Sequence, residues 1–423
     1  MKIRFQKQSR KQGSALIITL TFGVILLVVL ASYLMLLTSQ KNLVTRSQTW
    51  NAALTMAEAG IEEGLAQVNA SNSVFNFTAK ACTNFSGNGW TKTGVLYGPK
   101  TNLSLLGGFY SATISNDLPP TIYSTGSATV PTVGGTISRA VKITTVQESL
   151  ISVGLGAIGA IDFTGNGVAT DSYNSHMTNL STGGQYDSSK TSTNGDVASV
   201  GGLVNLGNHT IDGNLYLGAN AGYGGSGTVS GNVVSNYNVQ FPDVTLPPGS
   251  ASWPTATAPT NNTYDFTTSG NYVVNVNDSI IVEAGVTVNL NVTATTFSPS
   301  SLLIHGGITN SGTAYLYLTG PTSVTMAGNT AVDASNRPEN LYYFGTTNLT
   351  SITYSGNSEF IGVIYAPEAS MTLNGGGNNS GIQGSAIVGN ITMHGHYNFH
   401  YDESLAQSGP TRGYVANSWQ ELY

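Results

Sequence analysis

Charge and cysteine are both scarce in this sequence, and each scarcity excludes classes of protein. Only 9% of the 423 residues are charged. Cys82 is the single cysteine, which excludes a disulfide framework and a cysteine-based zinc site and predicts a buried, inert thiol. From residue 151 onward, Lys190, Arg337 and Arg412 are the only basic residues. So few cations offer no basic surface, and nucleic acid is therefore excluded as a partner.

The N-terminal part lacks acidic residues and helix breakers. No acidic residue precedes Glu58, no proline precedes Pro99, and no glycine lies between Gly23 and Gly60. Five of the 15 basic residues lie in the first eleven positions, so the remainder has 10 basic and 21 acidic residues and a formal charge of −11. The uncharged stretch from Ala15 to Leu37 is long enough to cross a bilayer as a helix. The basic head before it predicts a cytoplasmic N-terminus and an exported body.

The helical pattern continues beyond this apolar stretch. Apolar residues recur at spacings of three and four, which places them on one helical face: Trp50, Leu54, Ala57, Ile61, Leu65 and Val68. We expect one helix from about Ser14 to about Asn69, half in the membrane and half packed on a domain. A secretory signal is disfavoured, because its apolar core is shorter and ends at an A-x-A cleavage site.

These residues carry a resemblance to a known family. The stretch "RKQGSALIITLTFGVILLVVLASYLMLL", followed by "WNAALTMAEAGIEEGLAQ", resembles the N-terminus of type IV pilin-like proteins. It is most similar to PilX-like minor pilins and to the pseudopilins of type II secretion, and the "AEAG" element (Ala57 to Gly60) is typical of the PilX-like branch. The resemblance implies that a prepilin peptidase cuts between Gly13 and Ser14 and removes a leader of residues 1–13. It also implies a bacterial inner-membrane location and other pilin-like subunits as partners.

One position departs from the pilin pattern. Most pilins have glutamate at the fifth mature residue, and this chain has Ile18 there. A subunit that lacks this acid resembles the tip pseudopilin, so we expect a low-copy subunit at or near a filament tip. An uncleaved, single-pass membrane anchor is the alternative, because apolar segments after basic heads are common.

Two β-rich regions follow the helix. Short alternating runs between residues 71 and 150, such as "GGFYSATISN" and "TIYSTGSATV", predict a small antiparallel sheet that resembles the β-meander covering the helix in pilins. From residue 151 to 423, Gly-Asn corners separate short β-branched runs, which favours a parallel β-helix over a β-sandwich. The proline-rich region 241–262 is expected to be a long crossing loop on the side of this solenoid.

The end of the chain strengthens the β-helix hypothesis. Residues 360–405, beginning "FIGVIYAPEASMTLNGGG", resemble the β-helical C-terminal domain often found behind PilX-like N-termini in bacterial envelope proteins. That likeness implies a fold and an association, and no activity. We expect the tail, with Trp419 and Leu422, to cap the open end of the solenoid, where Ser418 and Glu421 fit a helix capping box.

Few residues of the sequence suggest catalytic chemistry. Anchored β-helices include polysaccharide lyases and hydrolases, but the chain has no Asp-Asp pair, and Asp402 and Glu403 would point to opposite faces of a strand. The "GLGAIG" match to a nucleotide-binding loop (Gly154 to Gly159) is a chance match in a glycine-rich chain without a following helix. We therefore expect a protein that is not an enzyme and needs no cofactor.

One histidine cluster is a candidate metal site. In "HGHYNFHYD", strand periodicity places His394, His396, His400 and Asp402 on one face. Two alternatives remain for it. Neighbouring ligands could hold a divalent metal, or the residues could form the solvated face of a final coil, which the wide spacing favours.

The sequence thus predicts a mainly β protein with one long N-terminal helix, a small sheet and a parallel β-helix. The expected function is that of a structural, minor pilin-like subunit of a type IV pilus or a secretion filament, which displays the β-helix for adhesion or assembly. A permanently anchored module that binds a cell-wall or extracellular glycan is the second hypothesis, and a polysaccharide lyase or hydrolase is the third.

Overall fold

The computed structural model divides the chain into two compact units, which we describe separately. It describes residues 12–422 with the exception of residues 71–88, 106, 118, 132–133, 165–168, 258–259, 276, 300, 308, 328–336, 356–358, 376–380, 396–397 and 408. The basic leader residues 1–11 and Cys82 lie outside the described residues. The first unit comprises described residues up to 146 together with 415–422, and the second comprises residues 147–414.

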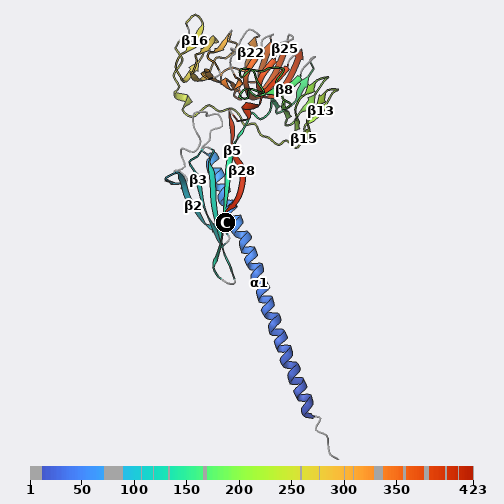
Figure 1. The fold of residues 1–423 in the computed structure, drawn as a ribbon. Coiled ribbons are helices and arrows are strands. Elements are labelled where there is room, and N and C mark those ends of the chain that lie inside the picture. Colours follow the sequence, from blue (N-terminus) through green and yellow to red (C-terminus); the bar gives the residue numbers. More distant parts are fainter. Residues whose placement is uncertain are drawn as a thin grey trace, which may run out of the picture. The chain divides into compact units, whose positions relative to one another are not determined.

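A single helix, α1 (Gln12–Ala70), dominates the first unit. Its bounds agree with the expected span, because no proline or central glycine interrupts the backbone hydrogen bonds. The helix includes an apolar window with a mean hydropathy of 2.7 and none of its surface buried, which makes it a candidate single membrane span. Figure 1 shows the N-terminal part of α1 extending beyond the strands that cover its C-terminal part.

The C-terminal part of α1 packs on a six-stranded sheet in the order β1-β2-β3-β4-β5-β28. Its strands are β1 (Lys92–Thr93), β2 (Leu96–Leu105), β3 (Gly108–Ser115), β4 (Thr121–Thr129), β5 (Thr136–Ser149) and β28 (Thr411–Leu422). Strands β1 to β5 form an antiparallel meander with the alternating burial that the sequence predicts.

The C-terminal tail corrects one expectation. We expected the tail, with Trp419 and Leu422, to cap the β-helix, and Ser418 and Glu421 fit a helix capping box. Instead, β28 is the edge strand of the small sheet beside β5. Ser418 hydrogen-bonds the hydroxyl of Thr144, and Glu421 forms an ion pair with Arg139 of β5. Pairing with β5 gives the tail backbone hydrogen bonds to a neighbouring strand, whereas a helix of one turn would be too short to be stable.

The second unit contains many short strands joined by turns and two long strands near its end. In its first part these are β6 (Leu155–Ala157), β7 (Ile161–Phe163), β8 (Ala169–Tyr173), β9 (Val197–Ser199), β10 (Leu203–Asn205), β11 (Thr210–Ile211), β12 (Leu215–Leu217), β13 (Gly222–Gly224), β14 (Thr228–Val229) and β15 (Val233–Ser235). After the short helix η2 (Ser250–Ser252) follow β16 (Thr263–Phe266), β17 (Gly270–Val274), β18 (Ser279–Val282), β19 (Thr287–Val292), β20 (Leu302–Ile304), β21 (Thr313–Leu318) and β22 (Ser323–Ala327). The last part contains η3 (Pro338–Asn340), β23 (Leu341–Gly345), β24 (Ser351–Ser355), β25 (Phe360–Gly375), β26 (Gly381–Gly395), β27 (Asn398–Asp402) and η4 (Glu403–Gln407).

These strands form parallel ladders. The first ladder runs β15-β12-β9-β6-β26-β25-β23-β21-β19-β17, and the second runs β13-β10-β7-β26-β25-β24-β22. The third runs β14-β11-β8-β27-β26-β25, and β16-β18-β20 make a separate parallel sheet. The long strands β25 and β26 belong to all three ladders because they bend from one to the next. Parallel pairing of the named strands in this unit argues against the β-sandwich alternative.

The ladders do not follow the order of the chain. Strand β26 lies between β25, which precedes it, and β6, which comes more than 200 residues earlier. The chain therefore enters the stack in the middle, proceeds to β13–β15 at one end, and resumes with β16 and β17 at the other. The expected crossing segment makes this return. Its residues Phe241 and Val244 are buried against the first ladder, and the Tyr365 hydroxyl donates to the Pro242 carbonyl at 2.9 Å.

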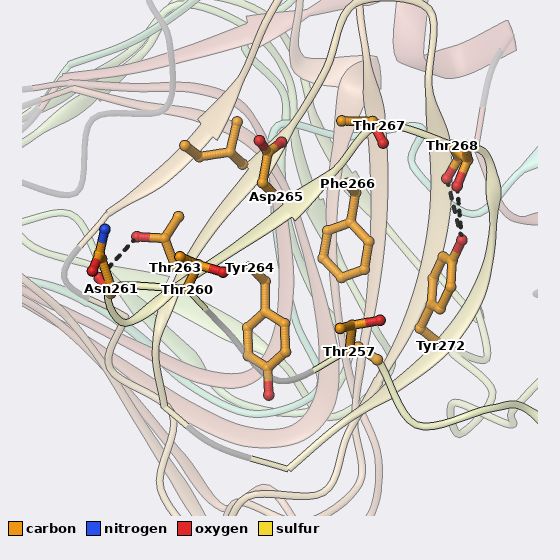
Figure 2. A pocket seen from close by; sticks show the side chains of 12 residues that line it. Thr257, Thr260, Asn261, Thr263, Tyr264, Asp265, Phe266, Thr267, Thr268 and Tyr272 are labelled. Carbon is orange, nitrogen blue, oxygen red and sulfur yellow. Dashed lines mark hydrogen bonds between the residues drawn. The ribbon is translucent and has the colours of Figure 1, made fainter.

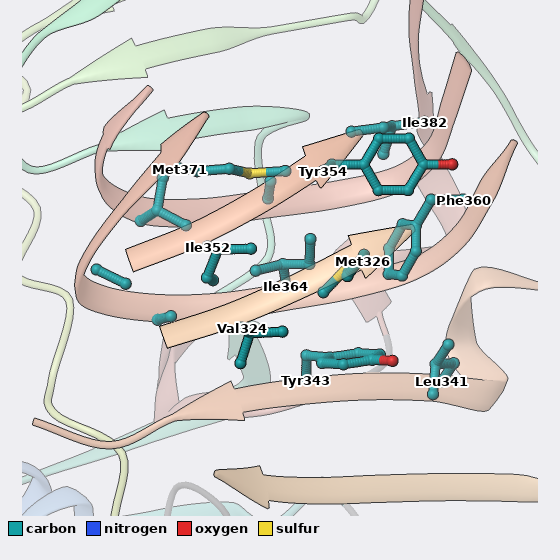
Figure 3. Close-up of a cluster of buried hydrophobic side chains, with 14 of the residues drawn as sticks. Val324, Met326, Leu341, Tyr343, Ile352, Tyr354, Phe360, Ile364, Met371 and Ile382 are labelled. Atoms are coloured by element: carbon teal, nitrogen blue, oxygen red, sulfur yellow. The ribbon is translucent and has the colours of Figure 1, made fainter. Parts of the chain in front are cut away.

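The core of the second unit lies between the ladders. Figure 3 shows side chains of the second ladder, such as Val324, Ile352 and Met371, pointing into one cluster with Tyr343 and Ile364 of the first. Each of these five residues is at most 4% exposed. Alternate residues of the same strands must then face outward, because side chains alternate along a strand.

Candidate functional site

The predicted assembly residues lie on two different surfaces of α1. Gly13 and Ser14 lie in its first turn. Ile18 belongs to the bare apolar part, where its side chain is 55% exposed. Ile61 is buried, and Leu54 and Leu65 are half-buried where the helix packs on the sheet. The helix is thus bare at one end and covered at the other.

Small residues make the contact between helix and sheet, and of these the helical spacing had placed only Ala57 on the packed face. Ala53, Ala57 and Gly60 are buried there. A Cβ atom on Gly126 of β4 would overlap backbone atoms of Ala53 and Ala57, and one on Gly60 would overlap Ser124. The "AEAG" element therefore has a physical role, because only small side chains permit this close approach.

Charged side chains fix both edges of this contact. Glu63 of α1 accepts a hydrogen bond from the Tyr110 hydroxyl and pairs with Lys100 of β2. At the other edge, the Arg139 guanidinium lies over the ring of Trp50 with 3.4 Å to the ring centroid, and it also pairs with Glu421. Trp50, a predicted assembly residue, is therefore a contact of the sheet as well.

The histidine cluster is not brought together as one face. Strand β26 ends at Gly395 and β27 begins at Asn398, so His394 belongs to one strand and His400 to the next. The exposed His394 has its Nδ1 atom 3.0 Å from the Thr164 hydroxyl. His396 lies outside the described residues. No group of three or more metal-binding side chains occurs among the residues that the structure describes.

The expectation of a solvated face is wrong for His400 and Asp402. His400 is 8% exposed, because the excursion between β8 and β9 places the Tyr186 ring against its imidazole at 3.6 Å between centroids. Asp171 of β8 bonds His400 through its Oδ1 atom and accepts the Tyr186 hydroxyl at 2.8 Å through Oδ2. Burial and this hydrogen bond raise the pKa of Tyr186 well above its usual value. Both imidazole and carboxylate are thus occupied by partners within the fold.

Asp402 is a buried carboxyl group at the end of β27. It is 0% exposed, and its Oδ1 atom accepts the backbone N–H groups of Ser175 at 3.0 Å and Ser404 at 3.1 Å. Burial raises the pKa of Asp402, although these hydrogen bonds to the serines act in the opposite direction. The group orders the turns around it and has no surface for a ligand.

A small pocket lies beside this cluster. Its volume is about 250 Å³, and Asn174, His176 and Glu403 are among the residues that line it. The Glu403 Oε1 atom accepts hydrogen bonds from the Ser172 hydroxyl at 2.7 Å and the Asn194 amide at 2.9 Å, which hold the carboxylate in place. The His176 Nε2 atom lies 2.8 Å from Glu339. Both groups are therefore engaged in joining segments of the chain.

A larger pocket lies at the β16 end of the ladders. It has a volume of about 540 Å³ and is lined mainly by threonines and aromatic rings. Figure 2 shows Tyr264, Phe266 and Tyr272 side by side, with Asp265 pointing to the other side of β16. Tyr264 and Phe266 are less than 8% exposed and close the end of the core. Among the described residues that line this pocket, Asp265 is the one charged residue.

Comparisons with known proteins are limited to one region of the chain. A family model described as a domain of unknown function (DUF7305) matches residues 253–408, which is less than half of the chain. No curated protein matches the chain. No solved structure matches it either.

Proposed function

We propose that the protein is a structural, pilin-like subunit whose helix α1 serves first as a membrane anchor and then as an assembly element. One observation carries this proposal. The same uninterrupted helix is bare and apolar from Leu16 to Leu37 and is seated on an antiparallel sheet from Thr49 to Val68. About 22 residues of helix span roughly 33 Å, which matches the hydrocarbon core of a bilayer.

The bare surface needs a cover in either state. Lipid covers it while the subunit is in the inner membrane, with the N-terminus on the cytoplasmic side and the body exported. The apolar helices of other pilin-like subunits cover it in a filament. Processing by a prepilin peptidase between Gly13 and Ser14 would release the helix for extraction, and the sequence resemblance supports this step.

The second unit is proposed to be a parallel β-helix that the filament displays. The repeating register of its ladders supports this architecture. Thr210 pairs with Thr228, 18 residues later, Asn271 pairs with Asn289, also 18 residues later, and Thr322 bonds Thr350, 28 residues later. Offsets of this size correspond to one coil per repeat. Among the described residues, no acid–base pair lines the larger pocket, which favours display over catalysis.

Ile18 supports a position at the filament tip. A buried terminal amine in an apolar filament core needs a carboxylate partner, because an unpaired charge in lipid costs several kcal/mol. Pilins supply it through the glutamate at this position to the subunit assembled before them. A subunit with Ile18 offers no such partner, so it fits where no subunit precedes it.

N-terminal sequencing of the protein from its native membrane tests this proposal. We expect a mature N-terminus at Ser14, and Gly13→Leu should abolish the cut. Gly23→Leu is the matched control, since Gly23 lies in the same helix and a Cβ there meets no atom within 4 Å. On sheared filaments, gold-labelled antibody against the second unit should mark the ends. A native chain that begins at Met1 would replace the proposal with a permanent anchor, and label along the shaft would contradict the tip position.

A further inference from the structure

The second ladder carries a regular array on its outer side. Four neighbouring strands present the same three-residue pattern, with a hydroxyl or amide side chain, an apolar side chain and a threonine in register. The two polar columns of this array, which we call the Ser–Thr array, are Ser323, Ser351, Ser370 and Asn390, and Thr325, Thr353, Thr372 and Thr392.

The middle residue of each pattern establishes which side the array faces. Val324, Ile352, Met371 and Ile391 are each at most 1% exposed and belong to the core. Figure 3 shows the first three pointing inward. Their neighbours on both sides must face outward, and all eight residues of the array are exposed or half-buried.

The four threonine hydroxyls of the array have no hydrogen-bond partner among the residues that the structure describes. Elsewhere in the same unit, exposed polar columns bond from strand to strand, as in Thr210–Thr228 at 3.1 Å and Asn271–Asn289 at 2.8 Å. In the array only Asn390 and Ser370, among the described residues, make such a contact, at 3.3 Å. A column that served stability alone would be expected to bond in the same way.

Parts of the other two ladders are covered on their outer sides by the chain itself. The crossing segment packs Phe241 and Val244 on the outer aromatic residues of the first ladder, such as Phe344 and Tyr365. The excursion after β8 lays Tyr186 on His400 of the third ladder. The Ser–Thr array is thus an outer ladder face that the described segments leave open along four neighbouring strands.

The geometry of this face resembles a lattice. Residues two apart on a parallel strand are separated by roughly 6.6 Å, and neighbouring strands by about 4.8 Å. Each threonine adds a hydroxyl group and a methyl group at a fixed rotamer, because β-branched side chains are stiff. The array contains no charged and no aromatic residue. At its end the threonine column passes into Asp162 and Asn205, which bond each other at 2.8 Å and are therefore engaged.

A ligand for this surface must itself repeat in two dimensions and be uncharged. Sugar rings are bound by aromatic platforms and converging amides, which the array lacks. Ion-binding sites in proteins are built around charged side chains, and the array has none. Water in the surface of an ice crystal repeats at spacings close to those of the array and donates and accepts hydrogen bonds as hydroxyl groups do. We propose that the Ser–Thr array binds ice. This inference goes beyond the proposed assembly function and does not depend on it.

Ice-recrystallisation inhibition by the purified full chain in detergent micelles tests the proposal, with empty micelles as the blank. We expect the chain to slow the growth of ice grains and to enter a slowly grown ice front. Thr353→Tyr, which places a large ring in the centre of the array, should abolish both effects. Thr228→Tyr is the matched control, because Thr228 is an exposed threonine on the third ladder, and it should retain them.

Circular dichroism of each variant establishes that it is folded. If Thr353→Tyr does not fold, Ser370→Tyr at the exposed position of the other column replaces it. A wild-type chain without effect on ice overturns the proposal, and so does a folded Thr353→Tyr that retains the full effect. Co-sedimentation with crystalline cellulose in place of ice would assign the array to a polysaccharide instead. Because micelles require neither processing nor assembly, failure here leaves the pilin-like proposal intact.

Discussion

The least expected residue of the chain is Asp402, a carboxyl group with no exposed surface in a protein with few charges. Strand periodicity predicted that it would share a wet face with the histidines. The prediction failed because burial depends on what covers a strand. Here the excursion after β8 covers β27, and Ser175 of that excursion donates its backbone N–H group to Asp402. A segment more than 200 residues away in sequence cannot be seen in the local pattern of β27.

Asp402 leads to a pH dependence with a defined sign. Its pKa is raised above the ordinary value of 3.8 by burial, so between the two values the folded state holds the proton more tightly than the unfolded state. The contribution of this group to stability is therefore present at low pH, declines as pH rises through that window, and is constant above it. The substitution Asp402→Asn keeps the Oδ1 acceptor and removes the titration. We expect the free energy of unfolding of Asp402→Asn, relative to wild type, to increase as the pH rises above 3.8, the ordinary pKa of an aspartate.

Asp187 is a control with a pKa shift of the opposite sign. It accepts hydrogen bonds from Ser189 and Thr182, which lower its pKa to about 2. Its contribution is present above the ordinary pKa and is lost on acidification, so Asp187→Asn should lose stability relative to wild type as pH rises. Urea denaturation across pH measures both. Parallel curves for wild type and Asp402→Asn would contradict the assignment of a raised pKa.

At the scale of elements, the sequence was most informative about α1 and its sheet. The absence of proline and the apolar spacing predicted the helix to within two residues of its observed ends. The runs that predicted strands correspond to β3, β4 and β5. The prediction of which helix residues contact the sheet was less accurate. Large residues such as Trp50 and Leu54 define the apolar stripe, but small residues make the tightest contact. Residue size, more than hydrophobicity, decides how closely a helix approaches a sheet.

Gly126 tests this contact between elements. A Cβ atom there would overlap the helix backbone at Ala53 and Ala57, which cannot move aside as a flexible side chain can. We expect Gly126→Ala to destabilise the first unit by about 1–3 kcal/mol, as overpacking does elsewhere. Thr125→Ala, at the next position on the exposed face of β4, should change stability by less than about 0.5 kcal/mol. Thermal unfolding in micelles measures both, and equal effects would show that the close contact is not needed.

The strand β28 shows what local patterns cannot supply. Its alternation is weak, and the tail with Trp419 and Leu422 suggested a cap. Its place is decided by β5, more than 270 residues earlier, through Thr144 and Arg139. An edge strand recruited from the far end of the chain is specified by tertiary pairing and leaves no signal in its own sequence.

At the scale of the whole molecule, the order of the ladders matters most for how the second unit is stabilised. If the strands were stacked in the order of the chain, the first and the last strands would lie at the two ends of the ladders. Here the last strands, β26 and β27, pair with the first, β6 to β8. The two parts of the unit therefore depend on each other, although turn residues and β-branched runs gave no indication of this closure. Stability of this unit should be a sum of interfaces between neighbouring parallel strands, and one of those interfaces joins its first strands to its last.

Because of this arrangement, the second unit is longer than the segment that the family model matches, residues 253–408. A fragment of residues 147–414 contains every ladder partner of the second unit. We expect it to be soluble, rich in β structure by circular dichroism, and monomeric.

A fragment of residues 253–408 retains β16 to β27 but lacks β6 to β15, so the backbone groups of Ala386–Val388 and Asn398–Asp402 would lose their partners. An exposed, apolar parallel edge recruits other chains, so this shorter fragment should aggregate. Size-exclusion chromatography of the two fragments decides the matter. If residues 253–408 are monomeric and unfold at the same temperature as residues 147–414, then β6 to β15 are an appendage that contributes nothing to the fold they join.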